Sequence, residues 1–250
     1  MIYEKPFRDQ LEIEAQAIYE QIDHAKITSS LPQMDDLEAL LSELKQKGYT
    51  HLLVINVSSG LSGTFNAFRL FLEEHKEFEI THYDSKTLAG HQGFLVQAAN
   101  EWVQENVPMP EIIKKLDELR YKDSMAFYTI NTLKYLKKGG RIGFVEGTIA
   151  DILHIKPVIT VNFDGVYETL NKGFGLNRAL IAMKQHLIEK FGSNPIDLII
   201  HYGTDHEKAV ALGERLKQEL TIKSLSITPL TPVLGIHTGP DMFAYIARKR

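Results

Sequence analysis

Apolar residues recur along this chain with spacings that alternate between helix and strand. Leu37, Leu40, Leu41 and Leu44 share one face of a helix that begins after Pro32 and ends at Gly48, and the apolar run 51–57 follows as a strand. The alternation continues with strands at 79–84 and 125–130 and with helical stripes at 94–102 and 112–119. Because helices separate these strands, we expect parallel pairing through crossovers.

The second half departs from this alternation. Asp164-Gly165 separates two β-rich arms, residues 158–163 and 166–170, and this pattern is typical of a hairpin. Helices at 177–190 and 206–220 flank a strand at 196–202, a last strand is expected at 224–228, and a short final helix is expected after Pro240. The sequence therefore predicts an α/β fold with parallel or mixed sheets, in two lobes of residues 1–121 and 122–250.

Composition excludes several classes of protein. The chain has 250 residues, a net charge of −4 and no cysteine, so disulfides, catalytic thiols and thiolate metal sites are excluded. Its acidic and basic residues alternate without a broad basic field, which argues against nucleic-acid binding. There is no apolar run near the roughly 20 residues of a membrane span and no signal-peptide pattern at the start, so we expect a soluble, cytoplasmic protein.

A turn rich in hydroxyl groups connects the strand at 51–57 to an amphipathic segment at 65–75. It reads Ser58-Ser59-Gly60-Leu61-Ser62-Gly63-Thr64. Glycines allow close backbone approach, and a helix amino terminus presents unpaired N–H donors, so the turn suits a carboxylate or a phosphate. The turn lacks the final glycine of a nucleophile elbow and the lysine of a phosphate-binding loop, and a helix cap explains only part of its composition.

Two further polar segments lie at expected helix or strand ends. Thr28-Ser29-Ser30 precedes Leu31-Pro32 and fits a helix cap, although it is also placed to converge with the first turn on one carboxylate. Asp84-Ser85 closes a strand, where Asp84 serves as a cap, a network member or a base.

Two candidate residues remain open between structural and functional roles. Residues 137–143 have the basic last turn and glycines of a helix end, and Arg141 is the member placed to meet an anionic ligand or a partner. His237 follows an expected strand and is equally suited to a structural role or to donating to a carboxylate. The other histidines lack metal-ligand spacing, and a metal site at His82 and Asp84 is rejected.

Taken in order, these motifs resemble the DegV family, the fatty-acid-binding proteins of the FakB type. The series comprises residues 28–32, 58–64, Asp84-Ser85, 137–143, Lys156-Pro157 with the Asp164-Gly165 hairpin, and 237–240. The resemblance implies two α/β lobes around an apolar tunnel that holds one long-chain fatty acid. It also implies a protein that is not itself an enzyme and that presents the acyl carboxylate to an ATP-dependent fatty acid kinase, for bacterial phospholipid metabolism.

The resemblance also assigns roles to residues. It implies that Ser29, Ser30, Ser62 and His237 bind the carboxylate, without metal or cofactor. Supporting positions would be Thr28, Ser59, Gly63, Thr64, Asp84 and Ser85. The residues expected to face the kinase are Arg141, Lys172 and Arg178.

This chain departs from the family pattern at three places, the mildest of which is Ser29 where many members have threonine. The family opens with a strand and an Asp-Ser turn that this sequence lacks, and the basic cluster near Phe174 is thinned to Lys172 and Arg178. Three alternatives therefore stay open: a serine hydrolase or a small-metabolite phosphotransferase that uses Ser62 and His237, and a family member that binds no ligand. Acyl chain length and oligomeric state cannot be deduced from the pattern.

Overall fold

The computed structural model describes residues 5–143, 145 and 155–250. Its helical elements are α1 (Ala15–Tyr19), α2 (Met34–Gln46), α3 (Thr64–Leu72), α4 (Ala89–Gln104), α5 (Met109–Glu118), the π-helical turn η1 (Leu119–Asp123), α6 (Lys134–Lys138), α7 (Leu176–Phe191), α8 (His206–Lys217) and α9 (Pro232–Thr238). Its strands are β1 (His51–Asn56), β2 (Glu79–Asp84), β3 (Ser124–Ile130), β4 (Ile155–Val161), β5 (Tyr167–Phe174), β6 (Ile196–Tyr202), β7 (Ile222–Pro229) and β8 (Met242–Lys249).

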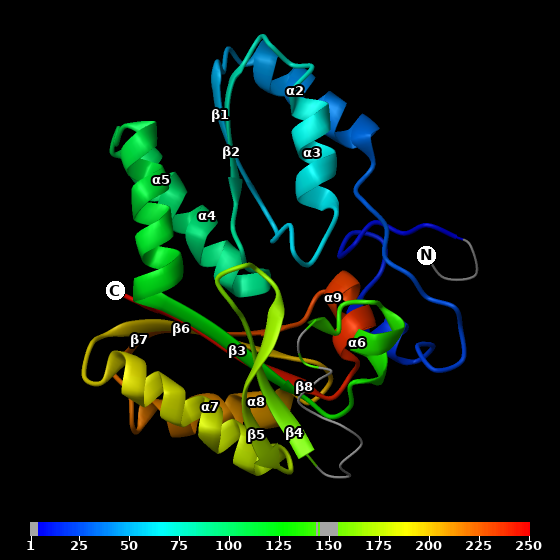
Figure 1. Ribbon diagram of the computed structural model, residues 1–250, viewed down its shortest axis with the longest axis vertical. Helices are drawn as coiled ribbons and strands as arrows, with labels where there is room; N and C mark the ends of the chain where they lie inside the picture. The colour runs from blue at the N-terminus through cyan, green and yellow to red at the C-terminus, as the bar shows by residue number, and fades with distance from the viewer. Residues whose placement is uncertain (1–4, 144, 146–154) are drawn as a thin grey trace.

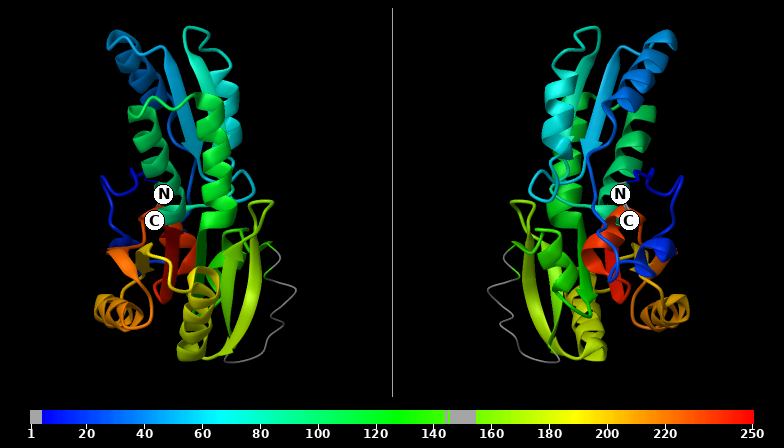
Figure 2. Two further views of the ribbon diagram at one scale, coloured as in Figure 1. Left: turned by 90° about the vertical axis from the view of Figure 1, so that its left-hand side faces the viewer. Right: turned by 90° about the vertical axis from the view of Figure 1, so that its right-hand side faces the viewer.

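The strands form two separate sheets, which divide the molecule into an upper and a lower part (Figure 1). The upper sheet consists of β1 and β2, paired in parallel, with α2 and α3 on one side and α4 and α5 on the other. The register places Asn56 opposite Asp84, so both strands end at the same edge. This edge faces the lower part of the molecule, and the turns that carry the candidate residues begin there (Figures 1 and 2).

The upper sheet buries its apolar side chains on both faces. Leu52 and Val54 pack with side chains of α2 and α3, whereas Leu53 and Ile55 pack with side chains of α4 and α5. Successive strand residues point to opposite faces, which explains this division. All four side chains are only partly buried, because β1 is paired on one side alone in the part of the chain that the structure describes.

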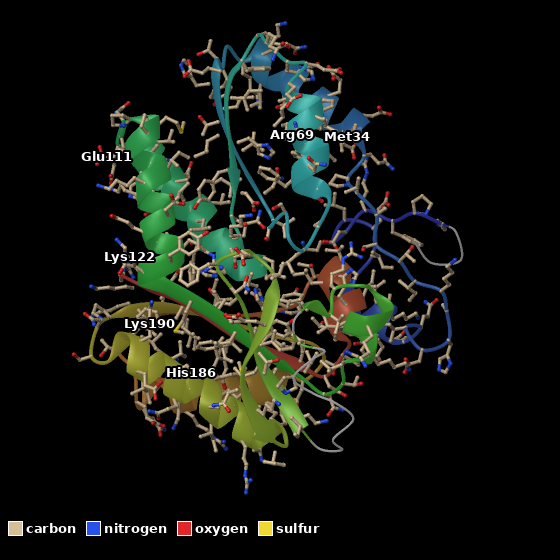
Figure 3. All side chains as sticks on the ribbon, in the orientation of Figure 1. Met34, Arg69, Glu111, Lys122, His186 and Lys190 are labelled. Carbon is tan, nitrogen blue, oxygen red and sulfur yellow. The ribbon has the colours of Figure 1, made fainter. Side chains whose placement is uncertain are left out.

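The lower sheet has six strands in the order β5-β4-β3-β8-β6-β7. The pair β6–β7 is parallel, and the other pairs are antiparallel, so the sheet is mixed as the sequence predicts. Phe127, Tyr245 and Leu198 point to one face, where α7 and α8 cover them. Tyr128, Met242 and their neighbours point to the other face, toward α6, α9 and the hydroxyl-rich turn. In Figure 3 the labels of His186 and Lys190 mark α7, which covers the first of these two faces.

Two predictions about the lower sheet are wrong. The final helix expected after Pro240 is strand β8, which lies between β3 and β6 at the centre of the sheet. Its residues are apolar on both faces, and such a short apolar run has the same sequence pattern in a buried strand as in a buried helix. Strand β3 was expected to pair in parallel because helices separate it from the preceding strands, whereas both of its neighbours run antiparallel to it.

Two other elements follow the pattern closely. The hairpin around Asp164-Gly165 is formed by β4 and β5, and α2 lies within the predicted limits of Pro32 and Gly48. The division into lobes at residues 121 and 122 stays a prediction. No helix in the described ranges is long and apolar enough to cross a membrane.

The amino-terminal arm, residues 5–33, crosses to the lower part of the molecule. Ile18 and Ile22 are buried against Tyr135 of α6 and Ile236 of α9. Asp23 accepts hydrogen bonds from Tyr135 and from the Lys134 ammonium, which lies 2.7 Å away. This packing carries the Thr28-Ser29-Ser30 segment to the end of α9.

Candidate functional site

The first residue of the hydroxyl-rich turn is structural. Ser58 is fully buried, its N–H donates to the carbonyl of Thr87, and its hydroxyl donates to the carbonyl of Gly165 over 2.7 Å. The N–H groups of Leu61 and Ser62 in turn donate to the carbonyl of Ser58. These bonds fix the path of the turn between β1 and α3.

Ser62 lies at the amino end of α3 and is partly exposed. Its hydroxyl oxygen accepts a hydrogen bond from the Thr64 N–H and lies 2.9 Å from the Thr64 hydroxyl. The residue at the N-cap position is Gly63, which has no side chain to satisfy the other N–H groups of the first turn. The turn therefore presents a hydroxyl and helix N–H donors together, an arrangement that favours an anion.

His237 lies in the last turn of α9 rather than after a strand, as the sequence pattern suggested. Its Nε2 is 3.1 Å from the Ser29 hydroxyl, although the two residues are 208 positions apart in the chain. Ser29 does not cap α2, whose N-cap position is Gln33. The cap interpretation of the Thr28-Ser29-Ser30 segment is thus wrong, and the structure joins this segment to His237.

The imidazole of His237 is held in one orientation. Gly139 packs against Nδ1 so closely that a Cβ at position 139 would overlap the ring. Nδ1 is buried and has no hydrogen-bond partner among the described residues. Burial, reinforced by the positive charge of Arg141, lowers the pKa of His237 to about 4, so the ring is neutral at pH 7. An unpaired buried acceptor is tolerated better than an unpaired donor, so the proton belongs on Nε2, facing Ser29.

Arg141 connects the hydroxyl-rich turn to Gly139, the residue that packs on His237. Its Nε donates to the carbonyl of Leu61 over 3.3 Å, and its Nη1 donates to the carbonyl of Gly139 over 2.6 Å. One carbonyl adjoins Ser62 and the other belongs to the residue that packs on His237. The guanidinium also lines a cleft of about 350 Å³. The residues around this cleft are Ser59, Gly60, Leu61, Ser62, Gly63, Gly140, Arg141, Gly143, Val166 and Tyr167.

Asp84 is a network member and caps no helix. Its carboxylate accepts hydrogen bonds from the N–H groups of Ser59 and Lys86 and forms an ion pair of 2.9 Å with the Lys86 ammonium. Burial alone would raise the pKa of Asp84, but these hydrogen bonds outweigh it and the net pKa is lowered. The adjacent Ser85 is fully buried and donates to the carbonyl of Thr87. Both residues therefore shape the loop beside the cleft.

The remaining candidates are more widely spread. Thr28 and Ser30 are exposed on either side of Ser29. Lys172 on β5 and Arg178 on α7 are exposed as well. In the described ranges no three histidine and carboxylate side chains form a group that could hold a metal ion.

The geometry does not pair Ser62 with His237 as nucleophile and base. The hydroxyl of Ser62 is 2.9 Å from that of Thr64, whereas the partner of His237 is Ser29. A nucleophilic serine requires a base within hydrogen-bond reach. The described contacts thus give the hydrolase alternative no support.

Two residues that shape this region were not predicted from the sequence. Gly139 was treated only as a helix end, although glycine is the one residue that fits against His237. Arg120 was not noticed at all, and it is buried between the two parts of the molecule with 7% of its surface exposed. The Gly139-Gly140 pair could have indicated a close contact at this position. Arg120 lies in a charged helix end, where an arginine gives no such indication.

These features define a two-part α/β protein whose cleft offers hydroxyl and guanidinium groups to an anion, with the Ser29–His237 pair close to Arg141. The chain belongs to the DegV family, since the model of this family of uncharacterised proteins matches residues 1–250. A DegV domain-containing protein of Clostridium perfringens is 34% identical over 246 residues, which are 98% of this chain and 87% of that protein.

Solved structures share the fold and bind lipid. A fatty-acid-binding DegV family protein from Thermus thermophilus matches with a TM-score of 0.90 and 26% identity, covering 100% of this chain and 89% of its own. A fatty-acid-binding DegV family protein from Streptococcus agalactiae matches with a TM-score of 0.85 and 27% identity, covering 96% and 86%. The recognition of the family and of its two-sheet α/β fold from the sequence is therefore confirmed.

The buried histidines predict a loss of stability in acid. His237 has a folded-state pKa of about 4 and His91 of about 3, both lowered first by burial. Between pH 6.5 and 4 the unfolded chain therefore takes up protons that the folded chain excludes, and each group lowers the free energy of unfolding by at most about 1.4 kcal/mol per pH unit. Urea unfolding at pH 7 and pH 5 measures this slope. His237→Gln should reduce it, and an equal slope in this variant and in the unmodified protein would contradict the assignment.

Proposed function

We propose that this protein binds one long-chain fatty acid and holds its carboxylate between Ser62 and Ser29, with His237 orienting the Ser29 hydroxyl. The observation that carries the proposal is the Ser29–His237 hydrogen bond of 3.1 Å beside the cleft that contains Ser62 and Arg141. Two segments from opposite ends of the chain meet there and bring neutral donors to one place. Fatty-acid binding by the Thermus thermophilus and Streptococcus agalactiae relatives supports the same ligand.

The donors are arranged for a negative oxygen. Because Nε2 of His237 donates to the Ser29 hydroxyl, the proton of Ser29 is free to point to a third atom. The Ser62 oxygen likewise accepts from the Thr64 N–H, and when the Thr64 hydroxyl donates to it as well, the Ser62 proton remains for a ligand. Hydrogen bonds to a charged acceptor are roughly twice as strong as neutral ones. A carboxylate fits this set, with the Arg141 charge nearby.

The acyl chain supplies most of the gross affinity in this proposal. Each methylene removed from water contributes about 0.8 kcal/mol, and ordering of the ligand offsets part of the total. Apolar side chains adjoin the hydroxyl groups: Leu61 and Leu234 are partly buried beside the site, and Leu31 is 48% exposed next to Gly63. We infer that the chain enters the apolar interior along these residues.

The proposal extends to presentation of the bound carboxylate to a fatty acid kinase. In this reading the protein itself catalyses nothing, and the kinase meets the surface around Arg141, Lys172 and Arg178. Lys172 and Arg178 are exposed, so their charges are available to a partner. With palmitate loaded, Lys172→Ala/Arg178→Ala should retain the lipid but slow its phosphorylation by an added fatty acid kinase; an unchanged rate would refute this extension and leave the binding proposal intact.

Mass spectrometry tests the binding proposal. The purified protein is measured under native conditions and then after denaturing extraction of whatever it carries. A single fatty acid in stoichiometric amount supports the proposal and gives the chain length. A protein that is empty, and that stays empty after incubation with palmitate, would reject fatty-acid binding and favour the ligand-free alternative.

A further inference from the structure

Arg120 is a buried cation that meets backbone carbonyls instead of a carboxylate. Its Nε and Nη2 donate to the carbonyl of Lys86 over 3.3 and 2.7 Å, and Nη2 also reaches the carbonyls of Val161 and Asn162 over 3.1 and 3.3 Å. No salt bridge to Arg120 is formed among the described residues. Its position in the π-helical turn η1 turns the side chain into the boundary between the two parts of the molecule.

The three carbonyls come from both parts. Lys86 lies in the loop after β2, in the upper part, whereas Val161 and Asn162 lead into the turn of the β4–β5 hairpin, in the lower part. Figure 1 shows the tip of this hairpin reaching the loops at the lower ends of β1 and β2. Figure 3 places Lys122, which belongs to the same turn η1 as Arg120, at this boundary.

A second contact reinforces the first. The Ser58 hydroxyl donates to the carbonyl of Gly165 at the hairpin turn. Gly165 has a φ of +81°, and a Cβ at this position would overlap the Ser58 oxygen. A Cβ on Gly60 would lie 2.7 Å from the same Gly165 carbonyl. The hairpin turn and the hydroxyl-rich turn are thus packed backbone against backbone.

This junction sets the spacing of the cleft walls. Residues 59–63 form one wall and directly follow Ser58, while Val166 and Tyr167 form part of the other and directly follow Gly165. If the hairpin withdrew, Arg120 would lose two of its three carbonyl acceptors, and any donor of the guanidinium that stayed buried would be unpaired, which is strongly disfavoured. The closed spacing is therefore the one that satisfies Arg120.

We propose that Arg120 is a positioning residue that locks the β4–β5 hairpin against the hydroxyl-rich turn and thereby retains the ligand in the cleft. Arg120 itself does not touch the ligand. The part that concerns ligand retention rests on the proposed function. The locking of the hairpin stands on the contacts alone.

Hydrogen exchange and lipid release test the two parts separately. Exchange is followed at the N–H groups of Asn162 and Gly165, whose bonds lie within the hairpin turn, in protein without added lipid. Release of palmitate is followed after rapid mixing with a lipid acceptor. The variants are Arg120→Met, Arg120→Lys, which retains a donor, and Ser58→Ala. The matched control is Arg248→Met, since Arg248 is also a largely buried arginine but pairs with Asp197 away from the cleft.

We expect Arg120→Met to raise both exchange and release at least tenfold, with Arg120→Lys in between and Arg248→Met close to the unmodified protein. Unchanged rates of exchange and release in Arg120→Met would overturn the proposal. Equally large increases in Arg248→Met would overturn it as well, because they would show that loss of any buried arginine destabilises the protein in general. Should Arg120→Met fail to fold, Arg120→Lys and Ser58→Ala decide, and wild-type rates in both would overturn it. If the unmodified protein binds no palmitate, the proposed function fails, while exchange still decides whether Arg120 locks the hairpin.

Discussion

Replacing Ser29 and Ser62 together with alanine is expected to weaken palmitate binding by about two to four orders of magnitude. Each hydroxyl donates to a charged oxygen in the proposed complex, and such a hydrogen bond contributes roughly 1.5–3 kcal/mol, or about a tenfold to hundredfold change in affinity. The loss leaves the buried carboxylate short of donors, which adds to the penalty. Single alanine variants should each show about half of the effect in free energy.

A direct titration with palmitate measures this loss. The matched control is Ser42→Ala/Ser226→Ala, because both of these serines are exposed and lie in α2 and β7, outside the cleft. The control should bind as tightly as the unmodified protein. Equal affinity of the Ser29→Ala/Ser62→Ala protein would show that the carboxylate lies elsewhere.

The largest effect on stability is expected from Leu136→Ala, at about 2–5 kcal/mol. Leu136 is fully buried in α6, a helix of five residues that is too short to persist without packing. Its side chain joins the cluster beneath Leu61, Ile142 and Leu234. The cavity would therefore loosen α6 just before Gly139 and Arg141, and ligand binding should weaken as well.

Urea unfolding followed by circular dichroism measures the free energy of unfolding of this variant. The control is Leu40→Ala, where the leucine is 48% exposed in α2 and should contribute less than about 1 kcal/mol. A loss at Leu136 no larger than at Leu40 would mean that α6 does not depend on this packing.

The upper part of the fold was readable from the sequence because its signals are local. Helix α2 has leucines at helical spacing between a proline and a glycine, and β1 is a short apolar run before glycines. Strand β8 carries no such signal, since Phe243, Tyr245 and Ala247 face one layer and Met242 and Ala244 the other. Its place at the centre of the sheet depends on pairing with β3 and β6, which are distant in the chain.

The candidate site was likewise predictable only where its residues are neighbours in the sequence. The hydroxyl-rich turn is contiguous, so Ser62 was identified from its own neighbours. The Ser29–His237 contact spans 208 positions, and only the resemblance to the DegV family brought these residues together before the structure did. Arg120 makes its bonds to backbone carbonyls, and a carbonyl acceptor leaves no trace in the sequence.

The state of the bound carboxyl group tests the central claim most directly. Protein loaded with palmitate labelled with ¹³C at the carboxyl carbon is followed by NMR from pH 8 to pH 5. Hydrogen bonds from Ser29 and Ser62 and the charge of Arg141 all favour the ionised form of the carboxyl group. We therefore expect a single resonance at the chemical shift of a carboxylate over the whole pH range. It should shift in the Ser29→Ala/Ser62→Ala protein. A resonance that titrates near the pKa of a free fatty acid would contradict the proposed site. So would a resonance with the same chemical shift in the Ser29→Ala/Ser62→Ala protein as in the unmodified protein.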